Sequence, residues 1–182
     1  IHLCTALVTL AGLVWTALDL HALDRDRGAR PAILRPLAIG TSLVLFVQIL
    51  LGAWVAGLNA GLASNTWPLM QGQLVPEADM SRGLFWAVTH DPFLLHFLHR
   101  WFAWIAFAML LALGWKALAR EGNAGKAVIG LAIGQVLLGI VTVLSGVSLW
   151  IAVAHQVTGA LLVAATAASA HAIGTRSTPG EA

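Results

Sequence analysis

The sequence predicts an all-α integral membrane protein, a helical bundle with five transmembrane helices. Hydrophobic residues make up 59% of the 182 residues and charged residues only 10%, whereas a soluble domain carries about 25% charged residues. Five apolar stretches are long enough to cross a hydrocarbon layer of about 30 Å, which takes about 20 helical residues. Because backbone polar groups in lipid must bond within their own segment, these stretches are expected to be helices.

Composition also excludes some classes of function. The net charge of +2, from 10 Lys and Arg against 8 Asp and Glu, is too small for a nucleic-acid-binding surface. The single cysteine, Cys4, can form neither an intrachain disulfide nor a cysteine-based zinc site. Any cofactor must therefore be held by other side chains.

The predicted helices follow one another along the chain, separated by polar segments or segments rich in Pro and Gly. They span residues 1–20, 37–58, 93–119, 127–144 and 149–173. The first starts without Met or a basic segment, so we interpret it as the last helix of a longer N-terminal half. In the loop 59–92, residues 80–88 (MSRGLFWAV) are predicted to form an interfacial helix with Phe85 and Trp86 among the lipid headgroups.

Basic residues predict the orientation, because cytoplasmic loops hold the excess of positive charge. If the loop 21–36 is cytoplasmic, eight of the 10 Lys and Arg residues lie inside, and only Arg82 and Arg100 lie outside. The loop 59–92 is then on the outer face, and the tail 174–182 is cytoplasmic.

A weak internal repeat pairs a glutamine helix with a histidine helix. Residues 48–52 read QILLG and residues 135–139 read QVLLG, and each segment precedes a helix with a histidine near its start. His2, followed by Thr5, resembles His155, followed by Thr158. The predicted unit is a helix pair, with the first helix of this chain as the second half of such a unit.

Depth separates the seven histidines into two groups. Three lie at helix ends or in the outer loop, where an imidazole needs no special partner: His21, His90 and His171. Four lie within or at the edge of apolar helices, where a polar group is costly unless it has a partner: His2, His96, His99 and His155.

His99 and His155 are the strongest candidates for cofactor ligands. Each lies about six residues into a helix that runs inward from the outer face, so both imidazoles are expected ~9 Å below that surface. Two imidazoles at one depth in a bundle can clamp a haem, whose iron then transfers electrons and does not bind oxygen. The alternatives are that each His only hydrogen-bonds to a neighbouring helix, or that His96 and His99 begin a zinc or copper site.

Arg100 follows His99 directly and has two interpretations. A guanidinium can hold a haem propionate bidentately, or it can reach lipid phosphates at the outer surface. The sequence leaves both open.

Three segments together resemble the haem A synthase family. They are residues 52–76 (GAWVAGLNAGLASNTWPLMQGQLVP), residues 95–104 (LHFLHRWFAW) and residues 154–161 (AHQVTGAL). The loop motif NTWPLM is specific, whereas a bare HR or HQ pair is not. The resemblance covers the whole chain, at the positions of the last five of eight helices.

The resemblance implies two four-helix halves, each with a haem near the outer face of a bacterial inner membrane. Residues 37–173 would be the C-terminal haem b domain with ligands His99 and His155, and Arg100 would lie beside the cofactor. Residues 1–20 would close the half that receives the substrate, haem O, with His2 as a ligand there. The catalytic residues would lie in helices that this chain lacks.

The implied reaction is the oxidation of a methyl group of haem O to a formyl group, which gives haem A for cytochrome oxidase. The implied partners are membrane lipid, the enzyme that produces haem O and an electron donor that the sequence does not identify, and a homo-oligomer is left open. Two residues depart from the family pattern. Asn59 stands where Asp is expected, and His96 stands where Gln is expected.

Two other functions compete with this interpretation. A membrane b-type cytochrome that only relays electrons would also use two axial histidines. A transporter or structural bundle with buried histidines is less favoured, because Asp19 is the only acidic residue predicted inside a helix.

Overall fold

The computed structural model describes residues 2–176, in which the regular elements are helices apart from an isolated bridge between Met70 and Gln73. Five helices are long and apolar enough to cross a membrane, which confirms the predicted fold class. They are α1 (His2–Arg25), α2 (Pro36–Gly57), α4 (Pro92–Leu118), α5 (Gly122–Leu144) and α6 (Leu149–Gly174). Residue 1 of the predicted first helix and residues 177–182 of the predicted tail lie outside the described residues.

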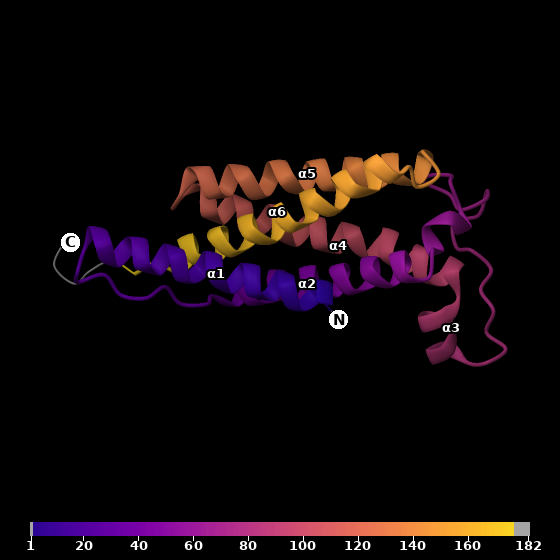
Figure 1. Ribbon diagram of the computed structural model, residues 1–182, viewed down its shortest axis with the longest axis horizontal. Coiled ribbons are helices and arrows are strands. Elements are labelled where there is room, and N and C mark those ends of the chain that lie inside the picture. The colour runs from indigo at the N-terminus through magenta and orange to yellow at the C-terminus, as the bar shows by residue number, and fades with distance from the viewer. Residues whose placement is uncertain (1, 177–182) are drawn as a thin grey trace.

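The five long helices run along the long axis of the molecule (Figure 1). Successive helices α4, α5 and α6 pack side by side, α2 packs on α4, and α1 packs mainly on α6. Segment 58–91, with the short helices η1 (Ala60–Ala63) and α3 (Leu84–His90), lies at one end, here called the loop end. The opposite end, which holds the loop 26–35 and the α4–α5 turn, is called the basic end.

Local sequence determines where the helices begin. Pro36 and Pro92 occupy the first turns of α2 and α4, where a missing N–H costs nothing. Asp91 caps α4, because its side chain accepts a hydrogen bond of 2.8 Å from the backbone N–H of Leu94. Helix α1 continues past the predicted end at residue 20 to Arg25, since charged residues in its last turn can lie in water while the backbone stays helical.

Small residues bring α4 and α5 into close contact near the basic end. A Cβ on Gly125 would lie 2.7 Å from the backbone oxygen of Gly114, so only glycine fits there. Such close approach is a usual basis of helix packing in membranes. Ser169 adds a hydrogen bond of 3.1 Å from its hydroxyl to the backbone oxygen of Ala124, which ties α6 to α5.

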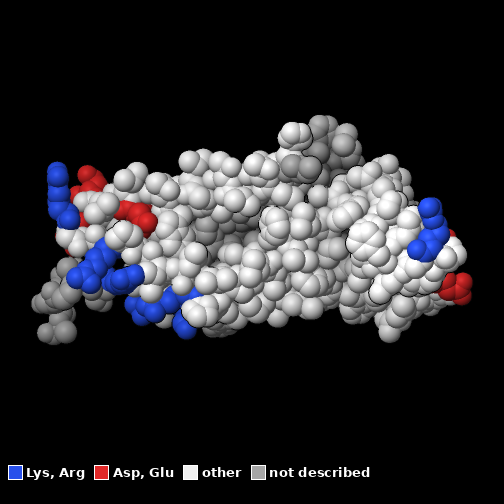
Figure 2. Space-filling view, turned by 90° about the horizontal axis from the view of Figure 1, so that it is seen from below, with Lys and Arg blue, Asp and Glu red and all other residues white. Residues whose placement is uncertain are grey.

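The charged residues of the face shown in Figure 2 gather at the two ends of the molecule, and the middle is uncharged. Most of the blue side chains are at the basic end. A long uncharged band between two charged ends is the surface expected of a bundle that spans a membrane.

The short helix α3 replaces the interfacial helix predicted at 80–88 and begins later. Gly83, at φ +88°, precedes it, and this left-handed backbone conformation cannot be part of an α-helix. Phe85 is 85% exposed, while the Arg82 guanidinium lies 4.7 Å from the centre of the Trp86 ring. Trp86 also stacks on His90 with ring centres 5.2 Å apart.

Candidate cofactor site

A cavity of about 550 Å³ lies inside the bundle and is lined by α2, α4, α5 and α6, with Leu3 and Leu7 of α1 on its wall. Most of the lining side chains are aliphatic or aromatic. The polar side chains that line it include Gln48 of α2, His99 of α4, Gln135 of α5 and His155 of α6, and further ones are Asn59, His96, Arg100, Thr142 and Gln156. An apolar cavity with a few polar groups, within about 300–1,000 Å³, is typical of a cofactor site.

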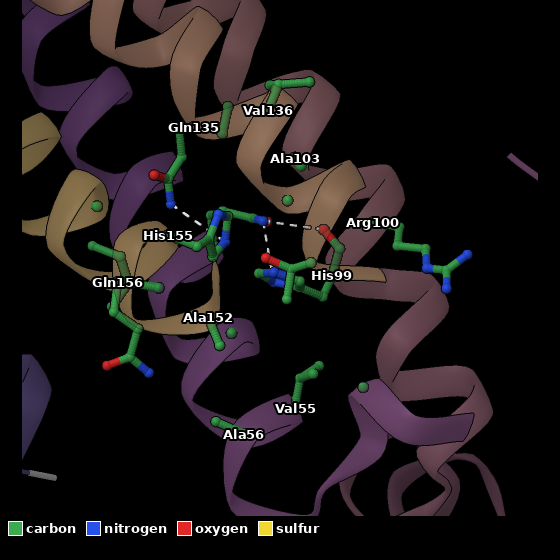
Figure 3. A pocket seen from close by; sticks show the side chains of 18 of the residues that line it. Val55, Ala56, His99, Arg100, Ala103, Gln135, Val136, Ala152, His155 and Gln156 are labelled. Atoms are coloured by element: carbon green, nitrogen blue, oxygen red, sulfur yellow. Dashed lines mark hydrogen bonds between the residues drawn. The ribbon is translucent and has the colours of Figure 1, made fainter. Parts of the chain in front are cut away.

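The two predicted ligands lie in this one cavity. His99 enters from α4 and His155 from α6, and Figure 3 shows both side chains directed into the same space. His99 and His155 each lie within the first two turns of their helix, and these helices, α4 and α6, are in contact. The site therefore presents two imidazoles from different helices to one apolar cavity.

Gln48 and Gly52 of α2 both contact His99. The side-chain amide nitrogen of Gln48 is 3.1 Å from His99 Nδ1 and also donates to the His99 backbone oxygen at 3.1 Å. A Cβ on Gly52 would lie 2.9 Å from His99 Cε1. A four-residue spacing places Gln48 and Gly52 on one helix face, so this face forms the seat of the ring.

The same arrangement recurs between α5 and α6. The Gln135 amide nitrogen is 3.4 Å from His155 Nε2, and a Cβ on Gly139 would lie 3.2 Å from His155 Cε1. The repeat read from the sequence thus has a structural counterpart, in which each Gln and Gly pair holds the histidine of the partner helix.

Buried polar atoms that lack hydrogen bonds lie at both pairs. Within the described residues, the side-chain oxygens of Gln48 and Gln135 and the Nδ1 atom of His155 are buried with no hydrogen-bond partner. Because such atoms are costly in a folded protein, they indicate a site that a further group completes. A planar cofactor with an iron between two imidazoles fits these residues, since the ring seats require glycine and the walls are apolar.

Arg100 is held by the loop. Its Nη1 donates to the Thr66 backbone oxygen at 2.8 Å and its Nη2 to the Ser64 backbone oxygen at 2.9 Å. In Figure 3 its side chain points away from both histidines. Neither sequence interpretation foresaw this contact. A guanidinium has five N–H groups, so donors also remain for an anionic group at the cavity mouth.

His96 is a partner of Arg100 and is almost fully buried, with 2% of its surface exposed. Its Nε2 accepts a hydrogen bond of 3.0 Å from Arg100 Nε, which makes it a neutral imidazole. No group of three or more His, Cys, Asp or Glu side chains that could hold a metal ion occurs in residues 2–176. The structure thus gives no support to a zinc or copper site at His96 and His99.

His2 stands apart from this cavity. It is exposed at the start of α1 and is not among the described residues that line the cavity. In Figure 1 the first turn of α1, which begins at His2, lies near the middle of the length of the bundle. The structure therefore does not bring His2 together with His99 and His155.

Sequence reasoning missed a polar contact at the basic end. His171 Nε2 and Asp19 Oδ1 are 2.9 Å apart, and Asp19 also accepts a hydrogen bond of 3.1 Å from the backbone N–H of Ala32. The Trp15 ring meets His171 edge-on, with centres 5.2 Å apart. The sequence does single out Asp19 as a carboxylate inside an apolar helix. It does not identify the partner, because His171 is 152 residues away.

Asn59, which departs from the expected family pattern, lies at the end of α2 and lines the cavity. Its backbone is left-handed, with φ 53° and ψ 25°. Asn is one of the few residues other than Gly that adopt this conformation readily. A structural role in the turn into η1 thus accounts for it.

Comparison with known proteins identifies close relatives. Residues 1–167 match the model of a family described as cytochrome oxidase assembly protein. Proteins named heme A synthase are similar to the chain: that of Erythrobacter litoralis is 62% identical over 174 residues, which cover 96% of this chain and 52% of the relative. The relative from Sphingopyxis alaskensis is 58% identical over 179 residues (97% and 50%), and that from Novosphingobium aromaticivorans is 48% identical over 184 residues (96% and 52%).

The chain spans about half the length of these curated relatives. No solved structure matches it.

Proposed function

The chain belongs to the cytochrome oxidase assembly protein family, and from this premise we propose that it is the haem b-binding part of a haem A synthase. The observation that carries the proposal is the single apolar cavity that receives both His99 and His155. The names of the relatives support the activity, and the paired imidazoles support the cofactor.

His99 and His155 would hold the iron of haem b in this cavity. Haem b would supply one-electron transfer when bound, as a haem held by two histidines does. Gly52 and Gly139 leave room for the two rings. The aliphatic side chains of the wall exclude water, which keeps the imidazoles neutral and able to bind metal.

The proposed reaction is the oxidation of a methyl group of haem O to a formyl group, which gives haem A for cytochrome oxidase. Haem O would bind at a second site that includes His2 and would come from the enzyme that produces it. The exposed position of His2 outside the cavity supports a separate site.

The proposed location is the bacterial inner membrane, with the loop end outside and the C-terminus in the cytoplasm. The support for this orientation is the distribution of basic residues, eight of 10 of which belong to the basic end or its tail. The cavity then lies nearer the outer face.

Haem analysis tests the proposed activity. The whole natural gene that contains this sequence is expressed in a bacterium that makes haem O and no haem A, and extracted haems are separated by chromatography. We expect haem A to appear, and to be lost in the variant His99→Ala. Protein that binds haem b but yields no haem A would instead support an electron-relay cytochrome.

A further inference from the structure

We propose that Gln48 and Gln135 are positioning residues that accept a hydrogen bond from the imidazoles of His99 and His155 and so orient both rings for iron. This inference rests on the proposed haem site. It adds two residues that act on the iron only through the histidines.

The first support is the duplication of the contact. Each glutamine lies one helix before its histidine and four residues before the glycine that seats the ring. The same three residue types meet in two separate helix pairs, although the amide faces Nδ1 of His99 in one pair and Nε2 of His155 in the other. A contact that served packing alone would not need a polar side chain in an apolar cavity.

The second support is the set of unpaired atoms. Both glutamine side-chain oxygens are buried without a hydrogen bond, and so is Nδ1 of His155. Within the described residues these two pairs account for three of the four buried side-chain atoms that lack a partner. The acceptors that remain unused therefore lie beside the two rings that would bind iron.

The third support is the position of the ring protons. The Gln48 amide nitrogen lies 3.1 Å from His99 Nδ1, and an accepting nitrogen carries no proton, so the proton of the neutral ring is on Nε2. An imidazole that binds metal through one nitrogen carries its proton on the other and donates it to a neighbour. For the ring to bind iron through Nε2, its proton must move to Nδ1. The Gln48 amide must then turn about its last bond, give up its hydrogen bond to the His99 backbone oxygen and present its own oxygen to Nδ1.

At the second pair the ring nitrogens are exchanged. The Gln135 amide faces Nε2 of His155, and Nδ1 is the unpaired atom. Here too one ring nitrogen faces the amide and the other has no hydrogen bond. A glutamine serves both states because it carries a donor and an acceptor on one side chain.

The experiment compares variants of the full chain purified in detergent with haem b. Gln48→Leu and Gln135→Leu remove the acceptor, and Gln48→Glu and Gln135→Glu keep an acceptor of the same shape. Gln73→Leu is the control, since Gln73 is exposed in the loop and does not line the cavity. Haem retention, the low-spin spectrum and the midpoint potential are measured, with size-exclusion chromatography as the check on folding.

We expect the Leu variants to retain haem about 10- to 100-fold less tightly and to have a raised midpoint potential. The Glu variants should stay low spin with a lowered potential, because a stronger acceptor makes the imidazole a stronger ligand. The Gln73 variant should behave as the unaltered chain does. Shifts of the midpoint potential in opposite directions in the Leu and Glu variants distinguish a hydrogen-bond acceptor from a merely structural side chain.

The proposal is overturned if the Leu variants keep the original retention and potential, or if Leu and Glu shift the potential in one direction. It is also overturned if the Glu variants lose haem while the protein stays folded, since the amide would then be needed as a donor. If His99→Ala keeps the low-spin spectrum, the haem site itself is wrong. If a Leu variant does not fold, the midpoint potential and haem retention of the Glu variant still test the proposal.

Discussion

Gly52 of α2 lies directly against the imidazole of His99 of α4, so that a Cβ at this glycine would stand 2.9 Å from the ring carbon Cε1. The equivalent distance from Gly139 to His155 Cε1 is 3.2 Å. A methyl group therefore cannot be added at Gly52 unless the ring moves, whereas at Gly139 a shift of a few tenths of an ångström is enough.

The first prediction concerns these glycines. Gly52→Ala should displace His99 and weaken haem binding by ~1–3 kcal/mol, the usual cost of overpacking, and Gly139→Ala should cost less. Haem titration of the purified variants measures both. Gly134→Ala, on α5 with nothing within 4 Å of its Cβ position, is the control for the added helix propensity. Equal affinities for Gly52→Ala and Gly134→Ala would contradict the prediction.

The second prediction concerns the ligands. His99→Ala and His155→Ala should each give a high-spin spectrum or lose the haem, because each removes one axial nitrogen. His96→Ala should stay low spin, since His96 binds Arg100. Absorption spectra of the oxidised and reduced protein show the spin state. Wild-type spectra in both ligand variants would exclude the assignment and make His96 the next candidate.

The third prediction concerns Arg100. Arg100→Gln removes its hydrogen bonds to the backbone oxygens of Ser64 and Thr66, and a hydrogen bond to a charged group contributes about 1.5–3 kcal/mol. Amide exchange in segment 58–76 should therefore become at least ~10-fold faster, with weaker haem retention and an unchanged low-spin spectrum. Arg82→Gln removes the contact with Trp86 and the attraction to Asp79, both outside segment 58–76, and should leave amide exchange in this segment unchanged. Unchanged exchange in the Arg100 variant would show that the loop is held by other contacts.

The fourth prediction concerns the basic end. Asp19→Ala leaves His171 and the Ala32 N–H without their acceptor, so stability should fall by ~1–3 kcal/mol. Thermal unfolding in detergent measures the change. Asp24→Ala, an exposed carboxylate on the same helix, should be neutral. Equal melting temperatures for the two variants would mean that the Asp19 contact contributes nothing.

The fifth prediction concerns orientation. In a Cys4→Ser background, a cysteine placed at Leu74 should react with an impermeant thiol reagent added to intact cells, and a cysteine at Arg27 should react only after the membrane is opened. The reason is the concentration of Lys and Arg at the basic end. Labelling of the Arg27 position in intact cells would reverse the topology.

The fold was predictable because it depends on the length of apolar runs, which lipid thickness sets. All five helices were found, and the family resemblance is confirmed by the match over residues 1–167. The errors lie at helix ends. Helix α1 extends to Arg25 and α5 begins at Gly122. Helical hydrogen bonds continue into polar segments beyond the membrane, and apolar runs do not mark these ends.

The histidines of the site were predictable from depth, but their supports were not. Gln48 and Gln135 served only to reveal the repeat, since the contact with a ring depends on how each helix is rotated in the bundle. The loop contact of Arg100 was missed because its acceptors are backbone oxygens 34 and 36 residues away, and backbone atoms have no signature in a sequence. His2 lies outside these contacts, and its assignment to a separate haem O site stays a prediction.

The contact between Asp19 and His171 also constrains the order of biogenesis. The carboxylate joins the first helix to the last, across 152 residues. At a synthesis rate of about 5–20 residues per second, the imidazole emerges from the ribosome roughly 8–30 s after the carboxylate. During that time α1 must wait in the translocon or the bilayer with its acidic group unmatched by this base, so α1 and α6 can join only after α6 has been synthesised.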